Sequence, residues 1–84
     1  MAPETFRKIL ITGSSGFIGS WIAGTLVKRG YPVRGLYRRK CIPAYLEEIR
    51  KEGAEVERGD LTIREEVRLS LQNIDAVIHC AALA

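Results

Sequence analysis

Short aliphatic runs alternate along the chain with longer segments in which apolar residues recur every three or four positions. The strand signal is clearest in residues 7–12 (RKILIT) and 76–82 (AVIHCAA), because continuous apolar runs are typical of strands covered on both faces. Residues 32–37 (PVRGLY) predict another strand, with its proline at the entry. Residues 55–58 (EVER) predict a short, charged strand at a sheet edge. The pattern thus predicts four strands, the first and last of them buried.

The three segments between these strands have the periodicity of amphipathic helices. Gly30 and Gly53 are expected to end the first two helices, and Pro43 to begin the second. Thr62 and Glu65 have the spacing of a capping box at the start of the third. The positions predicted to face the core are Ile18, Ile22 and Leu26 in the first helix, Leu46 and Ile49 in the second, and Ile63, Val67 and Leu71 in the third.

The element order βαβαβαβ predicts an α/β fold with a parallel sheet and right-handed crossovers. With strand order 3-2-1-4, the chain is the first half of a doubly wound, Rossmann-type fold plus one strand. We expect residues 1–84 to form a single truncated half-domain with no second domain. With 46% hydrophobic and 27% charged residues, the composition is that of a globular domain. The absence of a long apolar run predicts a cytoplasmic protein.

Residues 12–19 (TGSSGFIG) carry three glycines at intervals of three between the first strand and the first helix. Their predicted roles are, in order, to permit a tight turn, to let the backbone approach a pyrophosphate, and to let the helix press against the sheet. Amides at the helix start would face the phosphates. The alternative is an ordinary tight strand-to-helix connection. The predicted phosphate-binding residues are Gly13, Ser15, Gly16, Phe17, Ile18 and Gly19.

Three motifs together resemble the extended short-chain dehydrogenase/reductase family, which includes nucleotide-sugar epimerases and dihydroflavonol-type reductases. They are residues 12–19, residues 59–62 (GDLT) and residues 77–82 (VIHCAA), and they span nearly the whole chain. The resemblance implies that Asp60 contacts the adenine amine. It likewise implies that the strand carrying the third motif runs beside the cofactor. Leu61, Ala81 and Ala82 therefore join the predicted cofactor-binding residues. For Asp60, a plain turn position ahead of the Thr62 cap is the alternative.

The position expected to contact the adenosine ribose, at the end of the second predicted strand, is not acidic. An NAD site usually has a carboxylate about 20 positions past the glycines, whereas Tyr37 stands there and Arg38 follows it. A guanidinium can grip a 2′-phosphate through two parallel hydrogen bonds. NADP-dependent members of the family that this chain resembles also carry arginine here. We therefore predict NADP as the cofactor, with NAD second. Arg39 and Lys40 either assist Arg38 or form a solvated basic loop.

No catalytic residue is predicted. The resemblance implies chemistry that needs a tyrosine and a lysine in the pattern YxxxK. None of the three tyrosines, Tyr31, Tyr37 and Tyr45, has a lysine four positions later. His79 is interpreted as a satisfied core histidine and Cys80 as an inert buried thiol. We also predict no metal site, since no cluster has metal-ligand spacing.

Three functions remain open from the sequence. The first is the cofactor-binding piece of a reductase or epimerase, inactive alone. The second is a dinucleotide-sensing or interaction module. The third is a nucleic-acid-binding domain, suggested by residues 38–40 (RRK) and the net charge of +3, although no aromatic platform accompanies them. An unpaired outer edge on the fourth strand predicts a homodimer, and no membrane partner is expected.

Overall fold

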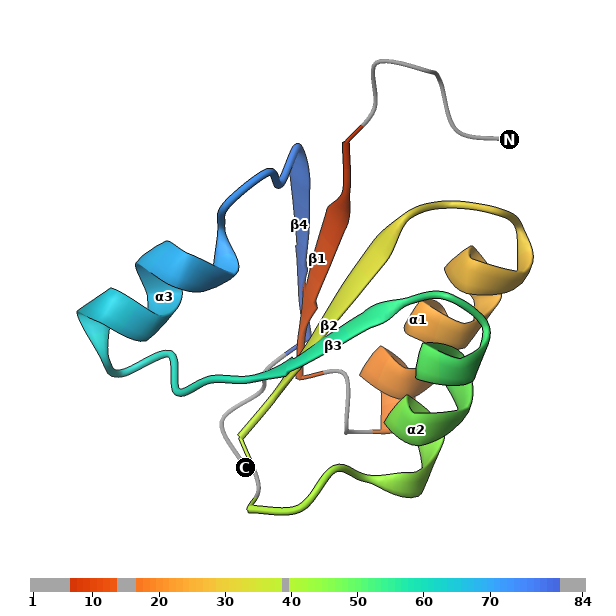
Figure 1. The fold of residues 1–84 in the computed structure, drawn as a ribbon, viewed down its shortest axis with the longest axis horizontal. Helices are drawn as coiled ribbons and strands as arrows, with labels where there is room; N and C mark the ends of the chain where they lie inside the picture. The colour runs from red at the N-terminus through yellow and green to blue at the C-terminus, as the bar shows by residue number, and fades with distance from the viewer. Residues whose placement is uncertain (1–6, 14–16, 39, 81–84) are drawn as a thin grey trace.

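The computed structural model describes residues 7–13, 17–38 and 40–80 (Figure 1). Its strands are β1 (Ile9–Thr12), β2 (Val33–Tyr37), β3 (Glu55–Arg58) and β4 (Ala76–His79). Its helices are α1 (Phe17–Lys28), α2 (Ala44–Lys51) and α3 (Arg64–Ser70). The elements thus follow one another in the predicted order.

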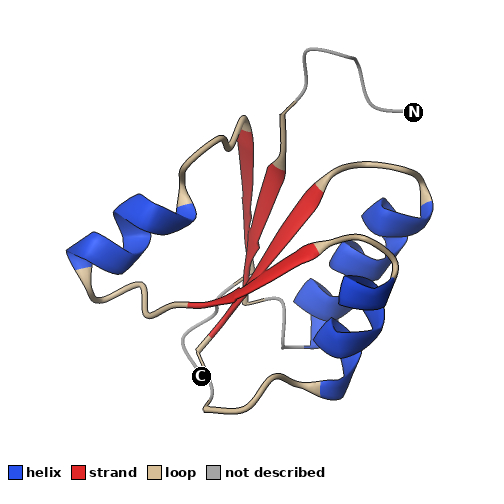
Figure 2. Cartoon of the chain, viewed as in Figure 1, coloured by secondary structure: helices blue, strands red, loops and turns tan. Residues whose placement is uncertain are grey.

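The four strands form one parallel sheet in the order β3-β2-β1-β4, which confirms the predicted topology. Figure 2 shows α1 and α2 on one side of the sheet and α3 on the other. This division follows from right-handed crossovers, because the chain moves outward from β1 to β3 and then returns past β1 to β4. The carboxyl ends of all four strands therefore share one edge of the sheet.

The main core lies between the sheet and the helices α1 and α2. Alternate residues of the strands point into it, among them Ile11 at 0% exposure and Val33 at 1%. Ala23 of α1 and Leu46 of α2 are both completely buried against them. The predicted core positions of the second helix are confirmed, since Ile49 is also buried.

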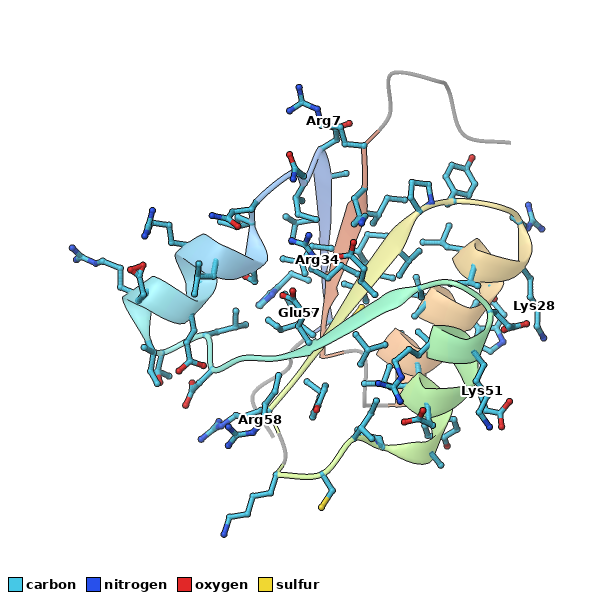
Figure 3. The ribbon with its side chains drawn as sticks, viewed as in Figure 1. Arg7, Lys28, Arg34, Lys51, Glu57 and Arg58 are labelled. Carbon is cyan, nitrogen blue, oxygen red and sulfur yellow. The ribbon has the colours of Figure 1, made fainter. Side chains whose placement is uncertain are left out.

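The sheet face toward α3 is more polar. Leu10 and Leu36 are buried on this face, but between them lies Arg34, which is only 6% exposed. Figure 3 shows Arg34 and Glu57 between the sheet and α3. The guanidinium of Arg34 donates to Glu55 Oε1 at 2.8 Å and to the backbone oxygens of Ser70 and Gln72 at 2.7 and 2.8 Å. A charged group thus joins β2 and β3 to the end of α3.

The predicted capping box at α3 is wrong. The helix begins at Arg64, after an extended Ile63 with no side-chain cap. Thr62 turns back instead, because its amide and hydroxyl both donate to Asp60 Oδ1, at 2.9 and 2.7 Å. Glu66 accepts a hydrogen bond from the Asp60 amide at 2.8 Å. The Asp60 carboxylate thus accepts hydrogen bonds from Thr62, the residue predicted to cap the helix, and Thr62 does not cap it.

Several positions predicted to be buried are exposed. Ile18 is 65% exposed, and Ile63 and Leu71 are each 44% exposed. The fourth strand was expected to be buried, yet three of its four residues are exposed, with Val77 at 49%. The reason is its place in the sheet: among the described residues, β4 pairs only with β1. No helix in the described ranges has the length and apolar character needed to cross a bilayer.

Candidate functional site

The end of β1 and the start of α1 form the first part of the site. Thr12 is 3% exposed, and the next residue, Gly13, has a φ of 68°, a left-handed value that glycine adopts without strain. Helix α1 begins at Phe17, so its first amides belong to the predicted phosphate-binding segment. Gly19 is buried, as expected for a glycine that brings the helix close to the sheet. Ser15 and Gly16 lie outside the described residues.

The backbone amide of Ile18 is a predicted phosphate ligand, and its side chain is a predicted core residue. Its exposed side chain contradicts the core assignment but leaves its amide in the first turn of α1. In this turn the amides have no partner inside the helix, and the helix dipole gives the region a partial positive charge. A diphosphate presents the complementary charge and acceptor oxygens.

The ends of β2 and β3 form the second part of the site. Gly59 continues the ladder after β3, where its amide donates to the Tyr37 oxygen at 2.8 Å. A Cβ at this position would lie 2.8 Å from Leu36 Cδ1, so close packing explains the glycine of the GDLT motif. Asp60 follows directly and lies beside Arg38, with 3.8 Å between Oδ2 and Nε. Two predicted site residues are thus brought together.

Arg38 and Asp60 line a shallow hollow of about 240 Å³ together with Arg58, Gly59, Ile63 and Glu66. The pKa of Asp60 is lowered, first by the Thr62 hydroxyl, then by the Thr62 amide and by the charges of Arg38 and Arg58. Asp60 is therefore a carboxylate at neutral pH. Arg38 is highly exposed, with 78% of its side chain accessible, so its guanidinium can reorient toward a ligand. Leu61, the residue after Asp60 along the chain, is 37% exposed.

The carboxyl end of β4 forms the third part of the site. His79 is exposed rather than a core residue, and its Nδ1 lies 2.7 Å from Thr12 Oγ1. Cys80 is partly buried and unpaired, and its amide donates to the Thr12 oxygen at 3.1 Å. Ala81 and Ala82 lie outside the described residues. Over the described ranges, no three His, Cys, Asp or Glu side chains gather as metal ligands would.

Sequence reasoning missed two arrangements, one near the amino ends of β2 and β3 and one at their carboxyl ends. One is the buried Arg34, whose signal was an arginine within an apolar strand followed by a strand with Glu55 and Glu57 at alternate positions. The other is Arg58, which the hollow places beside Arg38. Neither could be assigned from its own segment alone, because each depends on the register between β2 and β3.

The strand order, the helix placement and the glycine turn at the carboxyl edge define a Rossmann-type α/β domain. A family model described as the NAD dependent epimerase/dehydratase family matches residues 9–84. The chain therefore belongs to the NAD-dependent epimerase/dehydratase family, which agrees with the resemblance to extended short-chain dehydrogenases/reductases noted from its motifs.

Individual relatives agree with this assignment. The chain is 41% identical over 75 residues to cinnamoyl-CoA reductase 2 of Medicago truncatula, covering 87% of this chain and 21% of that protein. It is 37% identical over 76 residues to a 3-beta-hydroxysteroid dehydrogenase of Mycolicibacterium neoaurum, covering 90% of this chain and 19% of that protein. The chain thus spans about a fifth of the length of these relatives.

Solved structures show the same fold. A crystal structure of isoflavone reductase superimposes with a TM-score of 0.80 at 28% identity, covering 95% of this chain and 28% of that one. The NADPH complex of leucoanthocyanidin reductase from Vitis vinifera superimposes with a TM-score of 0.78 at 23% identity, covering 89% of this chain and 27% of that one.

Proposed function

We propose that this chain binds NADP(H), as the cofactor-binding part of a reductase of the extended short-chain dehydrogenase/reductase type. The observation that carries the proposal is the turn from β1 to α1, where a left-handed Gly13 precedes the first amides of a helix. A pyrophosphate would accept hydrogen bonds from these amides, including those of Phe17 and Ile18. Family membership supports a dinucleotide ligand.

Arg38 supports the choice of NADP. It stands directly after β2, where the adenosine ribose is held in a fold of this class. A 2′-phosphate carries charge that Arg38 can neutralise, and the neighbouring Arg58 adds a second positive charge beside the same hollow. NAD lacks this phosphate and so cannot form the charge-assisted contact with Arg38. NAD is therefore the weaker ligand in this proposal.

Asp60 supports placement of the adenine in the same hollow. Its Oδ1 already accepts two hydrogen bonds from Thr62, which fix the carboxylate in place. Its Oδ2 faces Arg38 at 3.8 Å, longer than a hydrogen bond. An adenine amine could therefore donate to Oδ2.

Hydride transfer is not proposed for these 84 residues acting alone. None of the three tyrosines has a lysine four positions later, and the chain covers only 21% and 19% of two reductase and dehydrogenase relatives. NADPH oxidation with aldehydes or ketones should therefore show no turnover. Measurable turnover would contradict this part of the proposal.

Selectivity measured by calorimetry tests the proposed function. Arg38→Glu should weaken NADP binding about tenfold or more, because a charge-assisted contact is replaced by repulsion, while NAD affinity changes little. Lys28→Glu makes the same charge change at an exposed position, which Figure 3 shows far from Arg58. This control separates local contact from net charge. Equal losses in both variants, or tighter binding of NAD than of NADP by the unaltered chain, would refute the proposal.

The outer edge of β4 is proposed as a pairing edge for a second copy. In the described part of the chain its backbone groups pair on one side only, with β1. Val77 is 49% exposed beside this edge. Strand addition to such an edge would satisfy its amides and carbonyls and extend the sheet.

A further inference from the structure

Thr12 and His79 face each other across the β1–β4 pair at the edge where the site lies. The parallel register places the two residues directly opposite. Thr12 Oγ1 and His79 Nδ1 are 2.7 Å apart. The threonine is 3% exposed, whereas the histidine is exposed to solvent. A buried threonine is thus in contact with an exposed histidine ring.

The residue that follows β4 contacts Thr12 at a second point. The Cys80 amide donates to the Thr12 oxygen at 3.1 Å. Thr12 is the last residue of β1, and the left-handed Gly13 comes directly after it. The two contacts therefore fix the orientation of the peptide from which the chain leaves the strand and begins the turn toward α1.

We propose that His79 is a positioning residue for the pyrophosphate of the dinucleotide, acting through Thr12. This inference rests on the proposed function. His79 itself does not touch the phosphates in this account. Its hydrogen bond limits rotation of Thr12 and so restricts the backbone that leads into Gly13 before the ligand binds. Binding then costs less conformational entropy at this backbone, which raises the affinity for the ligand.

The chemistry of the pair suits a permanent contact. With the ring hydrogen on Nε2, the Thr12 hydroxyl donates to Nδ1. When the ring is protonated, Nδ1–H donates and the hydroxyl oxygen accepts. The direction of the hydrogen bond reverses, but the contact persists. Because the pair acts at the pyrophosphate end, ADP-ribose, NAD and NADP should all depend on it by the same factor, unlike the selective effect of Arg38.

A double-mutant cycle with ADP-ribose as the probe tests this inference. Thr12→Val keeps the buried shape and removes the hydroxyl, and the exposed His79 can then be hydrated. We expect Thr12→Val and His79→Leu each to weaken binding roughly three- to tenfold, and the double variant to be no weaker than either. Losses that multiply in the double variant, or no loss in Thr12→Val, would overturn the inference.

Two near-isosteric variants separate positioning from packing. Asparagine can place its amide near the position of Nδ1, whereas glutamine reaches toward Nε2. His79→Asn should stay within about twofold of the unaltered chain, and His79→Gln should behave like His79→Leu. A lower unfolding midpoint with unchanged affinity in all of the folded variants would show a structural role only. If His79→Leu does not fold, Thr12→Val decides alone.

The inference and the proposed function fail in different ways. If the unaltered chain binds neither ADP-ribose nor NADP, both are wrong. If the unaltered chain binds and the Thr12 and His79 variants bind equally well, only the positioning role is wrong.

Discussion

Replacing Arg34 with methionine should destabilise the domain substantially. Methionine keeps most of the side-chain volume but removes every side-chain donor from a residue that is 6% exposed. The backbone oxygen of Ser70 would lose a buried hydrogen bond of 2.7 Å. The backbone oxygen of Gln72 would lose a partly buried hydrogen bond of 2.8 Å. Arg34 has no equivalent elsewhere on this face of the sheet among the described residues.

The magnitude follows from these contacts. A buried acceptor left without a donor costs about 1–3 kcal/mol. The Gln72 oxygen, only partly buried, costs less because water can reach it. Glu55 contributes little, since its side chain is 43% exposed and it retains its ion pair with Lys8. The expected loss is about 2–4 kcal/mol, against a total stability of roughly 4–13 kcal/mol for a chain of 84 residues.

Urea unfolding followed by far-ultraviolet circular dichroism measures this loss. Arg50→Ala is the matched control, because its ion pair with Glu47 lies on the surface within α2 and its removal should cost less than about 1 kcal/mol. A loss in Arg34→Met no larger than that of the control would refute the reasoning. It would mean that the contacts between Arg34 and the end of α3 carry no net stability.

Three further outcomes are expected. The pKa of Glu55 is lowered mainly by its hydrogen bond with Lys8 and then by Arg34. Its contribution to the free energy of unfolding is therefore present above about pH 4.5 and is lost as the pH falls through the lowered pKa of the folded state. Glu55→Gln should flatten this part of an acid-unfolding curve, and an unchanged curve would count against this prediction. Asp60→Asn should weaken NADP, NAD and ADP-ribose about equally in calorimetry, because all share adenine, whereas loss of NADP binding alone would argue against an adenine contact. Light scattering at high micromolar concentration should give the mass of a dimer for the unaltered chain. Val77→Lys, at the exposed edge of β4, should give the mass of a monomer. A monomeric mass for the unaltered chain would contradict pairing through that strand.

The order of the elements and the strand order could be predicted from the sequence because both depend on local patterns. Aliphatic β1, the amphipathic α2 and the glycines between β1 and α1 each indicate their structure within a few residues. The alternation of strands and helices then leaves few topologies. The tight turn predicted at Gly13 is confirmed by its φ of 68°, a left-handed value that glycine adopts without strain.

The predictions were wrong where a contact outside the local sequence pattern decides the outcome. Val77 has a side chain typical of a buried strand residue, but its exposure depends on whether another element covers β4 at the edge of the sheet. Thr62 has the spacing of a helix cap, but Asp60 offers its hydroxyl a closer acceptor. The Thr12–His79 contact needs the β1–β4 register, which no local pattern in the sequence specifies.

The central claim is that the amides opening α1 bind a diphosphate, and a titration of the ¹⁵N-labelled chain with NADP tests it most directly. Saturable shifts should be largest for the amides of Gly13, Phe17, Ile18 and Gly19, with smaller ones at Arg38 and Asp60, and ADP-ribose should reproduce the first group. Amides at the far end of α1, such as that of Lys28, should not move. Shifts confined to the outer surfaces of α1 and α2, or no saturable shift at all, would contradict the account.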